Sequence, residues 1–191
     1  MLLDATDGFY PNNTIPLRCV NDKGIVIKKG EESWVDLSNI KGNSTLIENM
    51  ELNFSKGLDS LYGRFLISAT DYEAIDLKKN NMNDYSLLEG FIEKKGLKII
   101  DSVTTTNYSD PEKPYKISFS ALAPYEIIGN KIYVSPFLHE PVSENLFSKP
   151  GRQYPIDLIY SYTKAYSTVI KVPENYKITY MPKNLEVDNK F

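Results

Sequence analysis

The chain has 191 residues, of which 25% are charged, and its formal net charge is −3. This length suits one domain or two small ones with a sizeable core, and the nearly balanced charge gives no electrostatic reason to bind nucleic acid or an anionic membrane. No apolar run approaches the roughly 18 residues of a membrane-spanning helix, so we expect no nucleic-acid partner and no membrane insertion. The start of the chain has no signal-peptide pattern.

Cysteine use excludes further classes of site. The single cysteine, Cys19, rules out an intramolecular disulfide and any metal site built from several cysteines. The single histidine, His139, has no second ligand motif beside it. We therefore expect neither a metal nor another cofactor.

The first third of the chain predicts strands. Residues 18–27 predict a hairpin that turns at residues 21–24 (Asn-Asp-Lys-Gly). A short strand follows at 33–37, around Trp34, and longer strands are predicted at 45–54 and 61–70.

One helix has clear start and stop signals. Asn83 or Asp84 can cap its start by accepting from an early backbone N–H. Apolar residues follow at helical spacing, and Gly96 suits the position just after the last turn. A shorter helix is predicted over residues 72–78.

The second half returns to strand patterns. A strand is predicted at 97–106, turn residues fill 107–114, and residues 115–121 alternate between apolar and polar as a half-buried strand does. Gly129 and Asn130 predict a two-residue hairpin loop. Further strands are predicted at 156–160, 167–172 and 177–180, with a turn at 173–175. The fold class is therefore mainly β (α+β), with antiparallel, β-sandwich-like sheets and one or two short helices.

Two groups of short motifs resemble a known superfamily. Residues 3–7 (Leu-Asp-Ala-Thr-Asp), 15–21 (Ile-Pro-Leu-Arg-Cys-Val-Asn) and 23–24 (Lys-Gly) resemble the end of the catalytic core of bacterial transglutaminase-like envelope proteins. Residues 152–157 (Arg-Gln-Tyr-Pro-Ile-Asp), 170–177 and 181–182 resemble their C-terminal β-domain. The chain departs from that pattern at Asn175, where glycine is preferred, and at Met181, where leucine is preferred.

The resemblance implies an organisation and a function. Residues 1–30 would be a remnant of the core end, 31–145 a β-rich middle region with a helix near 84–95, and 146–191 a C-terminal β module that can form one globular unit with the middle region. Asp4 would be the third member of a Cys-His-Asp triad, in which it orients the base. The nucleophilic cysteine and the histidine would precede it, so this chain itself is expected to be no enzyme.

The partners and the compartment also follow from the resemblance alone. The chain would be a non-catalytic accessory or scaffold region that braces its own upstream transglutaminase-like core and offers an interaction surface to a protein or a cell-wall glycan. Its setting would be periplasmic or secreted. Arg152, Pro155 and Asp157 would have a structural role at the entry of the C-terminal module.

Three alternatives remain open. A free-standing β-sandwich module could bind polysaccharide or peptidoglycan fragments through Trp34, Tyr154, Tyr160 and Tyr162, although tyrosine is also common in ordinary strand packing. A small enzyme could use Cys19 with His139. A calcium site could use Asp4, Thr6, Asp7 and Asn12, although the full twelve-residue loop pattern is absent.

Overall fold

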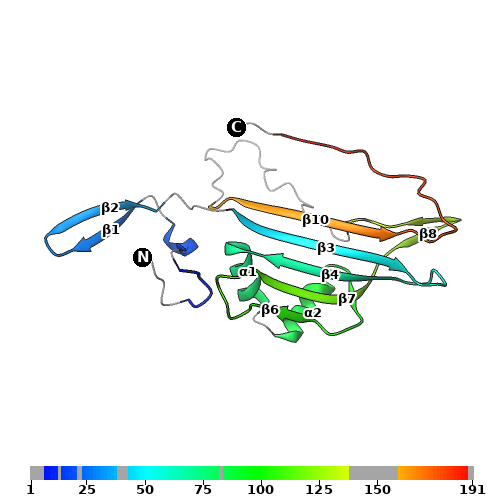
Figure 1. The fold of residues 1–191 in the computed structure, drawn as a ribbon, viewed down its shortest axis with the longest axis horizontal. Coiled ribbons are helices and arrows are strands. Elements are labelled where there is room, and N and C mark those ends of the chain that lie inside the picture. Colours follow the sequence, from blue (N-terminus) through cyan, green and yellow to red (C-terminus); the bar gives the residue numbers. More distant parts are fainter. Residues whose placement is uncertain are drawn as a thin grey trace.

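A computed structural model describes residues 7–12, 14–20, 23–37, 43–81, 84–137 and 159–188 (Figure 1). The described helices are η1 (Leu17–Cys19), a single 3-10 turn, α1 (Asp71–Asn81) and α2 (Tyr85–Glu93). The strands are β1 (Lys23–Lys28), β2 (Glu31–Asp36), β3 (Ser44–Phe54), β4 (Leu61–Ala69), β5 (Lys98–Ile99), β6 (Thr104–Thr106), β7 (Tyr115–Ala123), β8 (Glu126–Ile128), β9 (Lys131–Tyr133) and β10 (Tyr162–Lys171). The mainly β, α+β fold class is confirmed.

A six-stranded sheet forms the body of the molecule. Its strands follow the order β10-β3-β4-β7-β5, and β6 also pairs with β7. The pairings among β3 to β7 are antiparallel, but β10 runs parallel to β3 over ten residue pairs, from Tyr162 opposite Ser44 to Lys171 opposite Asn53. Residues far apart in the sequence therefore complete one sheet.

One face of this sheet carries the core. Alternate residues of β3, β4 and β7 are buried there, because strand side chains point to opposite faces in turn. Phe65 and Phe119 are register partners, and their rings stack 4.9 Å apart in this layer. Leu88 and Ile92 of α2 and Ala74 and Leu77 of α1 close the core from the helical side.

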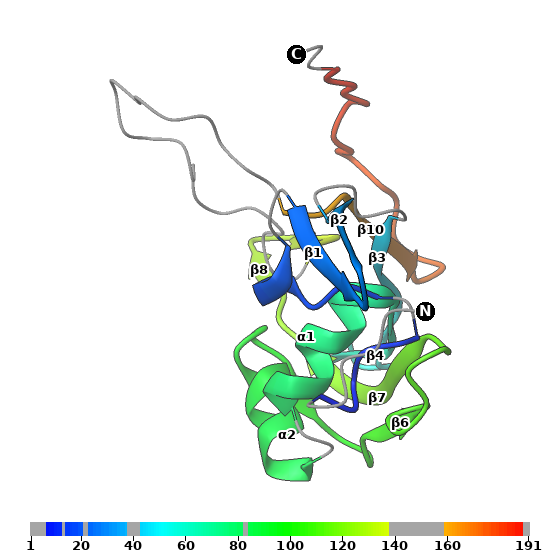
Figure 2. The same cartoon turned by 90° about the vertical axis from the view of Figure 1, so that its left-hand side faces the viewer.

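The second layer is helical. Figure 2 shows α1 and α2 on one side of the sheet. Among the described residues we find one large sheet covered by helices, instead of two large sheets packed face to face as in a sandwich. We call the uncovered side the open face.

The helix predictions were confirmed. Asp84 caps α2, where its side chain accepts from the backbone N–H of Ser86 at 2.8 Å, and Gly96 lies just past the helix with φ = 75°. The shorter helix predicted at 72–78 is α1, which extends further in both directions. A serine from β3 holds its start, because Ser44 Oγ accepts from the N–H of Tyr72 at 3.2 Å.

Two small hairpins lie outside the large sheet. The prediction of a hairpin at 18–27 with its turn at 21–24 was wrong. Residues 17–19 form a 3-10 turn, and β1 pairs with β2 through Lys29 and Gly30, where Gly30 has a φ of 82° that favours glycine. The hairpin predicted around Gly129 and Asn130 is present as β8 and β9. The domain boundary predicted after residue 30 falls in the turn that joins β1 to β2.

The C-terminal half differs from expectation in two more places. The strand predicted at 97–106 is broken into β5 and β6, and between them the side chain of Asp101 accepts from the N–H of Ser102 at 2.7 Å. A turn is present at 173–176, closed by a 2.9 Å bond from Tyr176 N–H to the Pro173 carbonyl. The strand predicted at 177–180 is not found: these residues have no regular secondary structure and pair with no other described strand. Of the strand predicted at 156–160, residues 156–158 lie outside the described part.

Candidate functional site

The N-terminal segment, residues 7–19, is held by side chains of α1; its described residues, 7–12 and 14–19, form no regular structure apart from η1. Tyr72 donates a 2.6 Å hydrogen bond from its hydroxyl to the carbonyl oxygen of Ile15. The rings of Tyr72 and Tyr10 lie edge to face with centroids 6.4 Å apart. Tyr10 in turn accepts from the backbone N–H of Leu17 at 3.4 Å. One side chain of α1 thus organises two separate points of this segment.

A second residue of α1 fixes the beginning of the segment. Lys79 forms an ion pair with Asp7, and its ammonium lies 4.9 Å from the centre of the Tyr10 ring. Asp7 also accepts from the N–H of Phe9 at 3.1 Å, which closes a local turn. We call the contacts of Tyr72 and Lys79 with Asp7, Tyr10 and Ile15 the α1 clamp.

Further contacts extend the attachment toward β7. The ring of Phe9 packs edge to face against Tyr108, with centroids 5.6 Å apart. The N–H of Asn12 donates to Glu112 Oε1 at 3.0 Å. Segment 7–19 is therefore attached to the body by apolar, ionic and hydrogen-bond contacts together.

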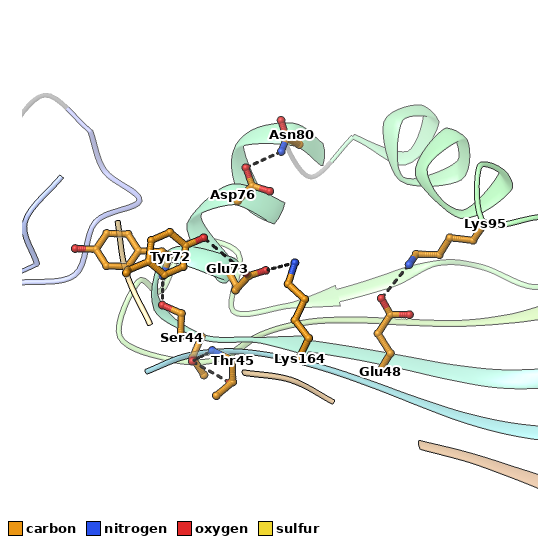
Figure 3. A network of polar contacts seen from close by, with 11 residues as sticks. Ser44, Thr45, Glu48, Tyr72, Glu73, Asp76, Asn80, Lys95 and Lys164 are labelled. Atoms are coloured by element: carbon orange, nitrogen blue, oxygen red, sulfur yellow. Dashed lines mark hydrogen bonds and ion pairs between the residues drawn. The ribbon is translucent and has the colours of Figure 1, made fainter. Parts of the chain in front are cut away.

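α1 is also tied to the edge strand β10 and to Tyr160, which lies just before it. Glu73 is 8% exposed, accepts from the Tyr160 hydroxyl at 3.4 Å and lies 3.6 Å from Lys164 Nζ. Figure 3 shows Glu73 pointing from α1 toward Lys164 on the sheet. Tyr160 also packs on Tyr72, with ring centroids 4.8 Å apart. Because Tyr72 belongs to both contacts, α1 links segment 7–19 to the C-terminal strand.

A buried ion pair lies further along the same face of the sheet. Glu48 of β3 is 6% exposed and binds Lys95 at 2.9 Å, just after α2 (Figure 3). Burial of a carboxylate is costly unless a cation compensates it. This pair therefore fixes the end of α2 over β3.

The environment of the tyrosines changes their acidity. Burial, assisted by neighbouring acidic groups, raises the pKa of Tyr72 to about 12. Burial and the Glu73 carboxylate raise the pKa of Tyr160 to about 12 as well. Both phenols are therefore protonated at neutral pH and available as hydrogen-bond donors.

The contacts described above attach the N-terminal segment and β10 to α1. Cys19 is exposed in η1, and His139, the base that a Cys19 enzyme would need, lies outside the described residues. Asp7, one candidate calcium ligand, is engaged by Lys79 and Phe9. The described residues contain no group of three His, Cys, Asp or Glu side chains that could hold a metal ion. None of the described helices is long and apolar enough to cross a membrane.

The predicted binding residues separate into two places. Trp34 is 67% exposed on β2, whereas Tyr160 and Tyr162 lie together at the start of β10, with ring centroids 6.1 Å apart. The residues predicted as sites that lie outside the described part are Asp4, Thr6, His139, Arg152, Tyr154, Pro155 and Asp157.

Sequence reasoning missed the residues of the α1 clamp. Tyr72 and Lys79 lie in α1, but the helix expected at 72–78 does not reach Lys79, and neither residue belongs to a motif. A weak signal existed, because Tyr72 and Lys79 are seven positions apart and therefore lie on one helix face. Their partners before residue 20 could not be identified from that spacing.

A second surface feature is the open face of the large sheet. A shallow hollow of about 780 Å³ lies over it, lined among others by Asn49, Glu51, Arg64, Ser118, Ser120 and Ser167. Lys171 pairs with Glu51 at 2.5 Å, and this contact together with the Arg64 charge lowers the pKa of Glu51. The surface is rich in hydroxyl groups and nearly balanced in charge.

Comparison with known proteins gives one family match. A family model described as "Domain of Unknown Function with solved-structure structure (DUF3858)" matches residues 130–191, the part that contains β9, β10 and the extended tail. No curated protein and no solved structure matches the chain.

Proposed function

We propose that this chain is a non-catalytic accessory region of a transglutaminase-like cell-envelope protein, which braces the catalytic core of that protein. The observation that supports it most is the α1 clamp. Tyr72 and Lys79 hold residues 7–15, and Asp4, the proposed third triad residue, lies only three positions before Asp7. A triad requires its acid within hydrogen-bond reach of the base. An anchor at Asp7, just after the acid, would help to hold Asp4 in that position.

The rest of the proposal follows from the same arrangement. The nucleophilic cysteine and the base would belong to the core, so the chain has no catalytic step of its own and needs no cofactor. The periplasmic or secreted setting comes with the proposed parent protein. The resemblance at residues 152–157 and 170–182 supports this parentage, and that stretch lies within the match at 130–191.

The experiment uses the protein that carries both the core and this chain. The rate at which iodoacetamide alkylates the core cysteine reports its thiolate, and therefore its pairing with the base, without any knowledge of the substrate. We expect the double variant Tyr72→Phe/Lys79→Met to change the pH dependence of this rate, because the segment that carries Asp4 loses its anchors. Tyr62→Phe, on the open face, is the matched control. Identical profiles for the clamp variant and the wild type would contradict the bracing role.

A second candidate function is supported by the open face. Hydroxyl and amide side chains with few net charges suit a neutral, polyhydroxylated ligand. Trp34 and Tyr162 are also exposed, but they lie off this face, on the β1–β2 hairpin and on the helical side of β10. The alternative is therefore a module that binds polysaccharide or peptidoglycan fragments. Calorimetric titration of the chain with soluble peptidoglycan fragments tests it, with Arg64→Ala as the variant that should weaken binding. No heat of binding at millimolar ligand would exclude this alternative.

A further inference from the structure

The β1–β2 hairpin presents an apolar stripe on one of its two faces. Strand alternation and the register place Ile25, Ile27 and Trp34 on the same face, with Ile25 directly opposite Trp34. Their exposed fractions are 49%, 85% and 67%. We call these three residues the hairpin stripe.

The other face of the hairpin differs. It carries Val26 and Val35, and a methyl group added at Gly24 would meet the side chain of Leu37 at 2.7 Å, so Leu37 already packs over this face. The Lys28–Glu31 ion pair also lies there. Only the hairpin stripe thus combines a large aromatic ring with two isoleucines that are about half exposed or more.

A hairpin of this kind is weak on its own. An isolated two-stranded ribbon is marginally stable in water, and it gains stability when a further layer covers its apolar face. The stripe has the composition of the centre of a protein interface, where tryptophan is enriched, and charged residues surround it. Those on the same face are Lys23, Glu32 and Asp36, which together carry one net negative charge.

The position of the hairpin along the chain indicates what covers it. It begins four residues after η1, and η1 ends the segment held by the α1 clamp. Figure 1 shows the hairpin beyond the end of the large sheet, beside this N-terminal segment. A folded unit that precedes residue 7 would therefore adjoin the hairpin, and its covalent linkage would give it an effective concentration on the order of millimolar at the stripe.

We propose that the hairpin stripe docks onto the catalytic core, on an apolar patch of the core that has a basic residue at its edge to match the net negative charge. This inference rests on the proposed function, because the core is the partner that the proposed function names. It adds a second contact to the α1 clamp: the clamp holds the chain that leaves the core, and the stripe holds the core's surface.

Hydrogen exchange followed by mass spectrometry tests this contact. The 191-residue chain is compared with the protein that also carries the core. We expect backbone amides of residues 24–35 to exchange at least about tenfold slower in the longer protein, because a docked ribbon opens less often. Trp34→Ser and Ile27→Ser should remove this protection, whereas Val26→Ser, on the opposite face, should retain it. Unchanged protection of β3 and β4 serves as the check that each variant is folded.

Every other outcome of this experiment would contradict a specific part of the proposal. Equal exchange of residues 24–35 in the two proteins, with residues 7–19 slower in the longer one, would overturn the docking and leave the bracing role intact. No difference in either segment would overturn both. Protection of the 191-residue chain that rises with its own concentration would show that a second copy covers the stripe, and would overturn the core as its partner.

Discussion

The hydroxyl of Tyr72 donates a 2.6 Å hydrogen bond to the carbonyl oxygen of Ile15, a residue 57 positions earlier in the chain. Tyr72 is 5% exposed and Ile15 is half-buried, so the Tyr72 hydroxyl cannot easily exchange this partner for water. This bond fixes a segment whose described residues form a single 3-10 turn. Tyr72 also packs on Tyr160, just before β10, so it helps to connect the N-terminal segment, α1 and β10.

Removal of this hydroxyl should weaken the attachment. We expect Tyr72→Phe to lower the free energy of unfolding by about 1 kcal/mol, because the Ile15 carbonyl loses its donor. Urea unfolding measures this change. Tyr62→Phe is the control, because Tyr62 is 43% exposed and lies on the open face. Equal effects of the two substitutions would show that the bond contributes nothing measurable.

Alkaline pH should destabilise the protein through its buried phenols. The pKa values of Tyr72, Tyr115 and Tyr160 are raised from 10.0 to about 12, with burial as the largest cause. Between pH 10 and 12 the unfolded chain loses these protons while the folded chain retains them, so stability falls as pH rises through this window and is unaffected by these groups below it. The urea midpoint measured from pH 9 to 12 tests this. In Tyr72→Phe the decline should be shallower, and an unchanged slope would contradict the assignment.

Two glycines, Gly90 inside α2 and Gly96 just past its end, should respond in opposite ways to alanine. Gly96 has a φ of 75° and open space around it, so Gly96→Ala should cost about 1 kcal/mol through backbone strain alone. Gly90 lies inside α2 with open space as well, so Gly90→Ala should stabilise by about 0.5–1 kcal/mol. Thermal unfolding of the two variants gives the signs, and a shift in the same direction for both would refute this explanation.

The buried ion pair between Glu48 and Lys95 should behave as a unit. Glu48→Gln leaves a largely buried ammonium without its carboxylate, so we expect a loss of about 3 kcal/mol. The double variant Glu48→Met/Lys95→Met removes both charges and should recover much of this loss. A double-mutant cycle from urea unfolding measures the coupling. Additive losses in the cycle would mean that the two side chains do not depend on each other.

Replacement of the only cysteine should have no measurable effect on stability or on hydrogen exchange. Cys19 is exposed, and the proposed function gives it no catalytic role. We expect Cys19→Ala to change the free energy of unfolding by less than about 0.5 kcal/mol, as surface substitutions usually do, and to leave the hydrogen exchange of residues 24–35 unchanged. Loss of a measured function in folded Cys19→Ala would instead support the small-enzyme alternative.

The sequence predicted the elements whose signals are local. The alternation in 115–121 became β7, the cap at Asp84 and the stop at Gly96 bound α2, and Gly129 turns between β8 and β9. These signals depend on side-chain period and backbone preference, which neighbouring residues determine.

Features that depend on distant contacts could not be predicted in the same way. Nothing near residue 162 indicates that β10 pairs in parallel with β3, which begins more than a hundred residues earlier. The turn of the first hairpin was misplaced because Asn21-Asp22-Lys23-Gly24 and Lys29-Gly30 are both acceptable turns, and the pairing of β1 with β2 decides between them. The α1 clamp was missed for the same reason, since Ile15 and Tyr72 meet only in the folded chain.

The most direct test of the bracing role is the DNA sequence immediately upstream of the Met1 codon in the source genome. Our account predicts that the reading frame continues upstream and encodes a cysteine at a helix start, followed by a histidine on a strand, before it reaches Asp4. An in-frame stop codon directly upstream of a functional start at Met1 would contradict it, and glycan binding at the open face would then become the leading function.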